Sequence, residues 1–208
     1  MIAKTIFLSI MVLFATITNL LADDLFTFKS LSINLGEGIY TNQTDSNALF
    51  AFNGGAEADI YANFKIGDSF KLRIGSGYIK KDMWVEHLDT VNAMIYPISI
   101  SFMNCFKNDK ANSDNLKYVG IGVAHYPAKV TYTKIEENSI GVVTERIEIK
   151  VNINSFGPIF FAGFENYLSK KVTCIGEVIL RNASFKFDSN EFSIDGVIFK
   201  IGLGYHFS

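Results

Sequence analysis

The chain has 208 residues and a formal net charge of -2, so it is long enough for one domain and has no basic excess that would suggest nucleic-acid binding. Its 19 Phe, 9 Tyr and 16 Gly against 3 Pro favour strands joined by tight turns over helices. It contains no CxxC, zinc or haem motif, and we therefore expect no metal site and no cofactor.

The first 22 residues are arranged like a secretory signal peptide. Lys4 precedes an apolar run from Ile6 to Phe14, and the small residue Ala22 is followed by two aspartates. An uncleaved membrane anchor is the alternative, but polar residues after Phe14 interrupt the apolar run. The pattern predicts cleavage after Ala22, export into an oxidising compartment, and one mature domain over residues 23–208.

Past residue 30, apolar and polar side chains alternate along the chain. Successive side chains of a strand point to opposite faces, so each segment has one apolar face and one polar or glycine face. A tight turn around Asp68 keeps the apolar faces of its two flanking segments on the same side. The alternation predicts an all-β fold of eight antiparallel strands: Leu31–Tyr40, Ala56–Ile66, Phe70–Lys80, Val91–Met103, Leu116–Tyr132, Ile149–Tyr167, Val172–Phe187 and Ser193–Phe207.

Three prolines and two cysteines lie in or beside these segments. Pro97, Pro127 and Pro158 fall inside predicted strands, and because proline has no N–H we expect them at bulges or strand ends. Cys105 and Cys174 fall on or beside strands that are not neighbours. Since a disulfide needs Cα atoms within ~7 Å of each other, we expect two free thiols.

A Gly-x-Gly motif occurs in four of the predicted strands, as LGEGI, IGSGY, VGIGV and IGLGY. Such a motif could belong to a phosphate-binding loop, but that loop needs a third glycine and a following helix, which none of the four has. The glycines fall on the face opposite to the apolar one. We expect them to leave room on a crowded inner face for large side chains such as Tyr61 and Arg73, with Tyr61 covering Gly75.

Two architectures fit eight long antiparallel strands. In a soluble barrel of the lipocalin type the apolar face points inward, whereas in an outer-membrane barrel it meets lipid and the lumen is polar. The glycine pairs favour the second, because a crowded lumen needs them and a water-facing surface does not. The apolar face also lacks charge over about 10 residues per strand, the length that a tilted strand needs to cross the hydrocarbon; Glu37 is the exception. Aromatic residues near strand ends would form the interfacial girdles: Tyr40, Tyr78, Tyr167, Tyr205 and Phe207.

Charged residues on the inward side of these strands form the candidate site. They are Glu57, Asp59, Lys65, Lys71, Arg73, Glu165, Glu177, Arg181 and Lys200. The apolar neighbours Ile175 and Ile179 blur the alternation around Glu177 and Arg181. Because buried charges persist only when they are paired, we expect a polar network within the lumen, in which the charges satisfy one another, rather than a catalytic set.

The ending KIGLGYHF resembles the C-terminal assembly signal of Gram-negative outer-membrane barrels, with Lys200, Gly202, Tyr205 and Phe207 at the corresponding places. The segment GPIFFAGFENYLSKKV is similar to the penultimate hairpin of small barrels of the OmpA, OmpX and OmpW type, and YPISISF to their fourth strand. The resemblance implies an eight-stranded antiparallel transmembrane β-barrel in the bacterial outer membrane. It also implies two partners, outer-membrane lipid and the barrel-assembly machinery, which would read the final strand during insertion.

Three functions are compatible with such a barrel. The first is a structural or surface-interaction role with a side-chain-filled lumen, the second a narrow channel for small or hydrophobic solutes, and the third a lipid-modifying enzyme. His87, His125 and His206 have no motif partner, so we expect no enzymatic activity. The sequence identifies no extracellular ligand or host surface.

The strand count also predicts an orientation. With the N-terminus in the periplasm, the turns at Asp68 and Lys170 are periplasmic. Four other connections would then be extracellular: Thr41–Asn53, Lys81–Thr90, Glu136–Thr144 and Ser189–Glu191.

Overall fold

The computed structural model describes residues 27–40, 55–66, 69–85, 88–107, 115–137, 143–187 and 190–207. The predicted signal peptide, the predicted loop over Thr41–Asn53 and His87 lie outside these ranges. Within them, no helix is long and apolar enough to span a membrane.

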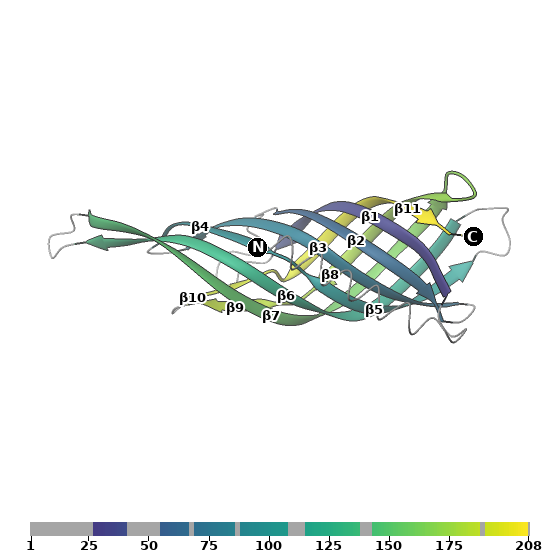
Figure 1. Cartoon of the computed structure of the whole chain (residues 1–208), viewed down its shortest axis with the longest axis horizontal. Coiled ribbons are helices and arrows are strands. Elements are labelled where there is room, and N and C mark those ends of the chain that lie inside the picture. The colour runs from purple at the N-terminus through teal and green to yellow at the C-terminus, as the bar shows by residue number, and fades with distance from the viewer. Residues whose placement is uncertain are drawn as a thin grey trace.

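The described residues form eleven strands, and every pairing between them is antiparallel (Figure 1). They are β1 (Thr27–Tyr40), β2 (Gly55–Lys65), β3 (Phe70–Val85), β4 (Leu88–Ile95), β5 (Ile98–Lys107), β6 (Asn115–Glu137), β7 (Val143–Tyr167), β8 (Val172–Arg181), β9 (Ser184–Phe187), β10 (Asn190–Ser193) and β11 (Gly196–His206).

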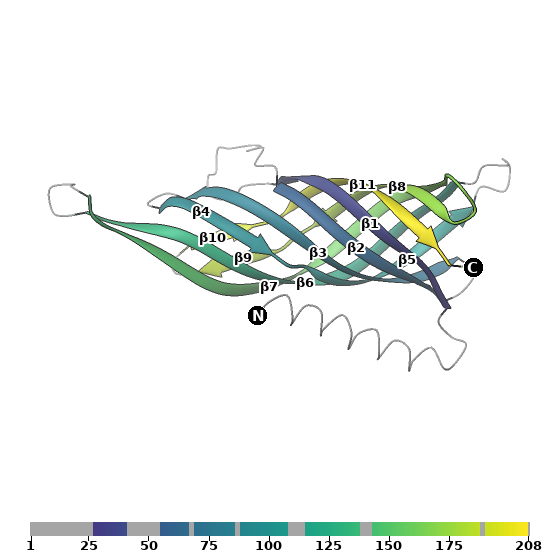
Figure 2. The same ribbon diagram turned by 45° about the horizontal axis from the view of Figure 1, so that its top comes forward.

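The main sheet closes into a ring (Figure 2). Its order is β1, β2, β3, then β4 and β5 in one shared place, then β6, β7, β8 and β11, which pairs with β1. Because β4 and β5 both lie between β3 and β6, the ring has eight places. The prediction of an eight-stranded antiparallel β-barrel is therefore confirmed.

Two of the predicted strands are broken in two. The segment Val91–Met103 separates into β4 and β5 at Tyr96 and Pro97. The segment Val172–Phe187 separates into β8 and β9 at Asn182 and Ala183. The last predicted segment, Ser193–Phe207, corresponds to β11 after a break at Ile194 and Asp195, and the prediction missed β10, which begins within the predicted connection Ser189–Glu191. Beyond these last two breaks, β9 and β10 pair only with each other among the described strands, and they form a small separate hairpin.

The prolines explain where the ladders break. Pro97 lies at the break between β4 and β5, where a residue without an N–H was expected. Pro127 and Pro158 instead lie inside β6 and β7, without a bulge. Each lies opposite a break in a neighbouring strand: the Tyr96 N–H donates to the Pro127 carbonyl at 2.8 Å, and the Asn182 N–H to the Pro158 carbonyl at 3.4 Å. A missing N–H costs little where the neighbouring ladder is already interrupted.

The outer face of the barrel carries the apolar band that the alternation predicts. Along β7 the outward side chains from Phe156 to Phe164 are apolar or small, and Phe156 itself is 72% exposed. This nine-residue span is close to the ~9–11 residues of a tilted transmembrane strand. Glu37 is also exposed and outward. Its ladder row runs over Ala56 to the exposed Lys80 in one direction and over Phe199 to Val178, both apolar and exposed, in the other, so Glu37 is a real exception on the apolar face.

Aromatic rings mark both borders of the band. At one border Phe28 packs against Phe64 and Phe207, with ring centroids 5.4 and 4.8 Å apart, and Tyr205 contacts Phe207. At the other border Tyr78 lies beside Tyr96, and the His125 ring stacks on Phe156. The Tyr167 ring instead contacts His206 on the inward side, so its predicted place in a lipid-facing girdle is wrong. The Tyr40 side chain lies outside the described part.

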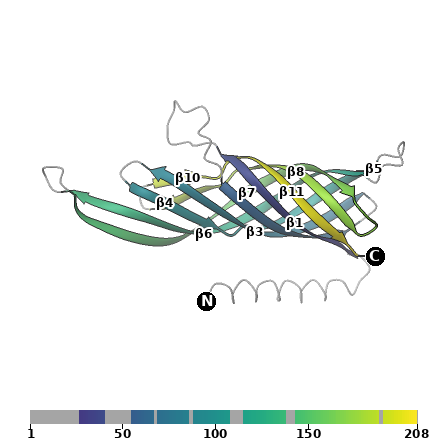
Figure 3. The ribbon, with the colours of Figure 1, turned by 90° about the horizontal axis from the view of Figure 1, so that it is seen from above.

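The two ends of the barrel differ in shape (Figures 1 and 3). One end, here the C-terminal end, carries the tight turn between β7 and β8 and the end of β11. At the opposite end β6 and β7 continue beyond the band, with β4 paired to β6 as far as Lys134, and their tips project as a two-stranded hairpin. We call the paired segments 129–137 and 143–152 the arm, and this end the arm end.

Candidate functional site

Inward side chains fill the barrel, and their chemistry changes along its axis. On β3, Arg73 is followed toward the arm end by Gly75, Gly77, Ile79 and Lys81, all on the inward side. On β6 the equivalent progression runs from the buried Tyr118 over glycines to a series of buried aliphatic and tyrosine side chains. A polar layer therefore gives way to an apolar layer toward the arm end.

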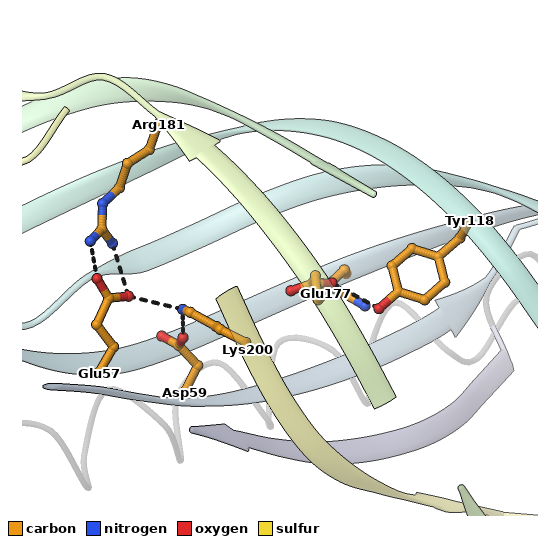
Figure 4. Close-up of polar contacts among 7 residues, drawn as sticks. Glu57, Asp59, Tyr118, Glu177, Arg181 and Lys200 are labelled. Carbon is orange, nitrogen blue, oxygen red and sulfur yellow. Dashed lines mark hydrogen bonds and ion pairs between the residues drawn. The ribbon is translucent and has the colours of Figure 1, made fainter. Parts of the chain in front are cut away.

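Glu57 is the centre of one half of the polar layer (Figure 4). Its carboxylate accepts from the Arg181 guanidinium and lies 3.1 Å from the Lys200 ammonium. Lys200 also donates to Asp59. These four side chains come from β2, β8 and β11 and are at least 92% buried, so two acidic and two basic groups neutralise each other across the lumen.

Arg73 is the centre of the other half. It pairs with Glu177, which also accepts from the Tyr118 hydroxyl at 2.9 Å. The Arg73 Nε donates to the Asn63 amide oxygen at 3.1 Å. Three aromatic rings surround the guanidinium, with centroids 4.6, 4.7 and 5.2 Å from its carbon, and they belong to Tyr61, Phe161 and Tyr118. The planar guanidinium lies against the ring faces and is held by hydrogen bonds. Together these side chains fill this section of the barrel.

The glycines provide the space for these side chains. A Cβ on Gly75 would lie 2.5 Å from the Tyr61 ring, and one on Gly120 would lie 2.2 Å from the Phe161 ring. Since real Cβ atoms do not approach so closely, any other residue at either position would displace an aromatic ring from the Arg73 cluster. The predicted covering of Gly75 by Tyr61 is confirmed, and the ladder places the two residues directly opposite each other.

The nine sequence-predicted lumen residues fall into separate groups. The two clusters above hold Glu57, Asp59, Arg73, Glu177, Arg181 and Lys200. Glu165 is buried near the C-terminal end, 3.5 Å from the His206 Nε2. Lys65 and Lys71 lie opposite each other in the β2–β3 ladder and are only partly buried, so they border the network rather than belong to its buried part.

On β8, Ile175 and Ile179 face inward together with Glu177 and Arg181. The inward side of this strand therefore carries both apolar and charged residues, which is why apolar and polar residues do not alternate along it. The two isoleucines share the inward side with the charges because the lumen contains apolar as well as polar groups.

Asn63 and Tyr118 also lie on the inward side of their strands but were not among the predicted site residues. The predicted connection Lys81–Thr90 is wrong, because β3 continues to Val85 and Lys81 is buried on its inward side.

The apolar layer combines the barrel wall with the β9–β10 hairpin. The Phe185 ring stacks on Phe192 with centroids 4.7 Å apart and meets the Tyr126 ring edge-on. These residues belong to a buried cluster that the four strands β3, β4, β6 and β7 complete: Ile79, Val91, Ala93, Ile95, Ala124, Tyr126, Ala128, Val130, Tyr132, Ala183, Phe185, Phe192 and Ile194, with Ile149, Val151, Ile153 and Ile159 packed against it. The hairpin thus fills the arm end of the barrel.

Polar contacts fix the base of this hairpin. The Lys81 ammonium donates to the Ser193 carbonyl at 2.8 Å, and the Arg181 Nε donates to the Ile194 carbonyl at 3.2 Å. The Asp195 carboxylate accepts from the Ala183 N–H at 2.6 Å. Lys81 lies next to the exposed Lys80 and Asp82, beyond the lipid-facing band. Burial, together with the nearby Arg181, lowers the pKa of Lys81 to about 8, and Asp195 opposes that shift.

His206 is not arranged for a catalytic relay. The His206 Nε2 lies 3.2 Å from the Thr173 hydroxyl and 3.5 Å from Glu165, so one ring nitrogen faces both groups. A serine-protease-type relay needs the nucleophile and the carboxylate on different nitrogens. The described residues contain no cluster of His, Cys, Asp or Glu suited to a metal ion. Cys105 and Cys174 are free thiols on β5 and β8.

Solved structures of three bacterial proteins are similar to this chain. Neisserial surface protein A (NspA) matches with a TM-score of 0.57 at 15% identity, over 88% of this chain and 99% of that one. Ail, the attachment invasion locus protein of Yersinia pestis, in complex with the heparin analogue sucrose octasulfate, matches with a TM-score of 0.51 at 10% identity, over 86% and 98%. The outer membrane protein OprG from Pseudomonas aeruginosa matches with a TM-score of 0.51 at 14% identity, over 86% and 96%.

No protein-family model matches the chain, and no curated protein matches its sequence. At identities of 10–15% the structural likeness concerns the fold. The closed ring and the outward apolar band match the fold of these three similar structures. The chain therefore has the fold of the small outer-membrane β-barrels.

Proposed function

We propose that this protein is an integral protein of the bacterial outer membrane, with a filled barrel as its anchor and the arm as its interaction surface. The observation that carries the proposal is the filled interior. Two ion-pair clusters cross the lumen, and an apolar cluster follows them toward the arm end. An eight-stranded barrel is just wide enough for side chains to fill it, whereas general porins need ~16–18 strands.

The arm supports a role at the cell surface. Its outward side chains on β7 are Arg146, Glu148, Lys150 and Asn152, all exposed and polar, and they continue directly from the apolar band. The C-terminal end, by contrast, has the short turn over Leu168–Lys171. In outer-membrane barrels short turns face the periplasm and longer connections face the outside, so the arm projects from the cell.

The proposal assigns no enzymatic step. Its function depends on anchoring and contact, and the charged groups of the two lumen clusters are paired with each other. A narrow channel for small or hydrophobic solutes is the second candidate, because the arm end of the lumen is lined with apolar side chains.

A planar bilayer separates the two candidates. The refolded protein should give no sustained conductance, because the polar and apolar layers block the lumen in series. Regular conductance steps from the unmodified protein would contradict the filled anchor and support the channel.

Labelling of intact cells tests the surface role. Lys150→Cys and Lys170→Cys are compared in a background with Cys105→Ala and Cys174→Ala. A membrane-impermeant maleimide should label the first variant and leave the second unlabelled. Labelling of only the second would reverse the orientation, and the arm would then be unable to act outside the cell.

A further inference from the structure

The arm has an unprotected strand edge. Between Val143 and Asn152 the strand β7 forms a ladder with β6 alone, among the strands that the structure describes. On its other side β7 meets β8 only from Ile159 onward, and Asn182 covers the backbone at Pro158. Figures 2 and 3 show the arm projecting away from the rest of the sheet. An exposed edge of this length can pair with another strand.

The direction of the backbone groups on this edge follows from the neighbouring ladder. The Pro127 carbonyl accepts from Tyr96, so it points away from β7. In an antiparallel ladder, directly opposite residues point either both toward or both away from each other. Asn154, the partner of Pro127, therefore points its backbone groups away from β6. By alternation, Arg146, Glu148, Lys150 and Asn152 do the same, and their side chains lie on the exposed face.

The charges on this edge alternate in sign. Arg146, Glu148 and Lys150 follow one another on the exposed face. Glu148 and Lys150 form an ion pair at 2.5 Å, and both side chains are more than half exposed. The opposite face of the same segment is apolar, with Ile147, Ile149 and Val151 partly buried.

This sequence is complementary to itself when two copies run antiparallel. If the pairing is centred on Ile149, Glu148 of each copy lies opposite Lys150 of the other, and the apolar faces also meet. A pairing centred on Ile147 brings Arg146 opposite Glu148. Centres at Glu148 or Lys150 would instead place identical charges directly opposite each other, which destabilises a ladder.

We propose that the arm edge of one molecule pairs antiparallel with the same edge of a second copy, in a register centred on Ile147 or Ile149. The inference rests on the proposed surface role of the arm and names its partner. Both copies use the same patch, as in a two-fold symmetric interface. The new ladder joins the sheets of the two copies edge to edge through their β7 strands.

The geometry also decides where the second copy lies. The arm continues along the long axis of the barrel (Figure 1). Antiparallel arms therefore make the two barrels point in opposite directions. Two copies in one membrane point the same way and cannot form this pairing. The partner lies in a facing membrane, so the pairing connects two membranes rather than two neighbours within one.

Vesicle clustering tests the charge complementarity. The protein is folded into preformed phosphatidylcholine vesicles, and clustering is followed by light scattering. The unmodified protein should cluster vesicles. Glu148→Lys makes the stripe wholly basic, and the pair Arg146→Glu with Lys150→Glu makes it wholly acidic. Each should reduce clustering about tenfold, because attractive cross-strand pairs become repulsive.

Mixing vesicles of the basic variant with vesicles of the acidic variant should restore clustering. Heat-dependent gel mobility verifies that each variant is folded. Clustering that survives in both separate variants, or that does not return in the mixture, would overturn the proposal. Vesicles of unmodified protein that cluster only after another protein is added would overturn it as well.

Cysteine cross-linking tests the register. In a background with Cys105→Ala and Cys174→Ala, Ile147→Cys and Ile149→Cys place a thiol at each allowed centre. At either centre the two copies of the residue form a non-hydrogen-bonded pair of the antiparallel ladder. The Cα atoms of such a pair are ~4.5 Å apart, within reach of a disulfide. One of the two variants should form disulfide dimers on clustered vesicles, and Glu148→Cys and Lys150→Cys should not. Dimers at position 148 or 150, or at none of the four, would contradict the register.

Surface labelling separates this inference from the proposed function. If Glu148→Cys is labelled on intact cells but vesicles do not cluster, the arm is a surface element and only the self-pairing is wrong. If Glu148→Cys is not labelled, the surface role itself is wrong.

Discussion

The polar layer and the apolar layer occupy the same barrel but are stabilised by different interactions. In the polar layer Arg73, Glu177, Glu57 and Lys200 are held by specific partners. Removal of one partner leaves a buried charge, which costs far more than the net contribution of the pair. In the apolar layer Phe185 and its neighbours contribute through the area that they bury, and the loss of one leaves a cavity but no uncompensated charge.

The comparison shows what a small barrel needs at each level of the membrane. Within the band, the backbone is satisfied by the ladders, and the lumen can hold charges because they neutralise each other. Beyond the band, strands that leave the ring need a core of their own. The β9–β10 hairpin provides that core at the arm end.

Removal of Arg73 should have the largest effect. Arg73→Met leaves Glu177 buried without its cation and should lower the free energy of unfolding by ~3–5 kcal/mol. The double variant with Glu177→Met should recover much of that loss, because it replaces the ion pair by apolar groups of similar volume. Urea unfolding in detergent micelles measures both. A double variant that is less stable than Arg73→Met alone would mean that the two side chains do not act as a pair.

The apolar layer should respond with the opposite pattern. Phe185→Ala should cost about 3 kcal/mol, through lost burial and the cavity left against Phe192 and Tyr126. Adding Phe192→Ala should increase the loss further rather than recover it. The same unfolding measurement applies. Recovery in this double variant would remove the distinction between the layers.

Lys81 lies where the β9–β10 hairpin meets the barrel wall, and its shifted pKa should make the free energy of unfolding depend on pH. Its folded pKa of about 8 is below its ordinary value of 10.5, so above about pH 8 the unfolded chain holds a proton that the folded chain has lost. The free energy of unfolding should therefore rise between about pH 8 and 10.5, by roughly 2 kcal/mol after allowance for solvent screening. Lys81→Met removes this group, and its difference from the unmodified protein should change over that pH window. An equal difference at pH 7 and pH 10 would contradict the shift.

The girdle at the C-terminal end lies outside both layers and should have the smallest effect on equilibrium stability. Tyr205→Ala with Phe207→Ala removes the ring contacts of Phe207 with Phe28 and with Tyr205 and should cost about 1 kcal/mol. Assembly in cells should fall more than this value suggests, if these residues are read during insertion. The folded fraction in outer membranes, measured by heat-dependent gel mobility, should decrease. An unchanged fraction would show that the ending is not an assembly signal.

The eight places of the ring follow from the sequence because one period of two continues along each strand. A barrel strand presents one face to lipid and one to the lumen, so composition separates the faces even where single residues such as Glu37 deviate. The same rule places Glu57, Asp59, Arg73 and Lys200 inward. It could also have found Tyr118, which shares that side, whereas Lys81 lies just beyond the predicted end of its strand at Lys80.

The breaks in the strands could not be read in this way. Alternation continues through Asn182 and Ala183, because β9 keeps the inward and outward sides of β8. At the other break it gives no usable signal, since Phe192, Ser193 and Ile194 are all buried. What separates the hairpin from the ring is a set of contacts distant in sequence, such as Lys81 with Ser193. The partners within the polar network depend on the barrel register in the same way, since Arg73 and Glu177 come from strands on different sides of the lumen.

The closure of the ring has a consequence for the order of the sequence itself. Phe207 donates its N–H to the Lys29 carbonyl at 2.8 Å, so the start of β1 and the end of β11 are adjacent. A short linker could join them, and new termini could be opened in the turn over Leu168–Lys171, which would give a circular permutant with every ladder intact. In that permutant β7 would be the last strand and β11 an internal one. If β11 is needed only because it pairs with β1 and β8, the permutant should still assemble. If β11 is recognised because it ends the chain, the permutant should fail to assemble.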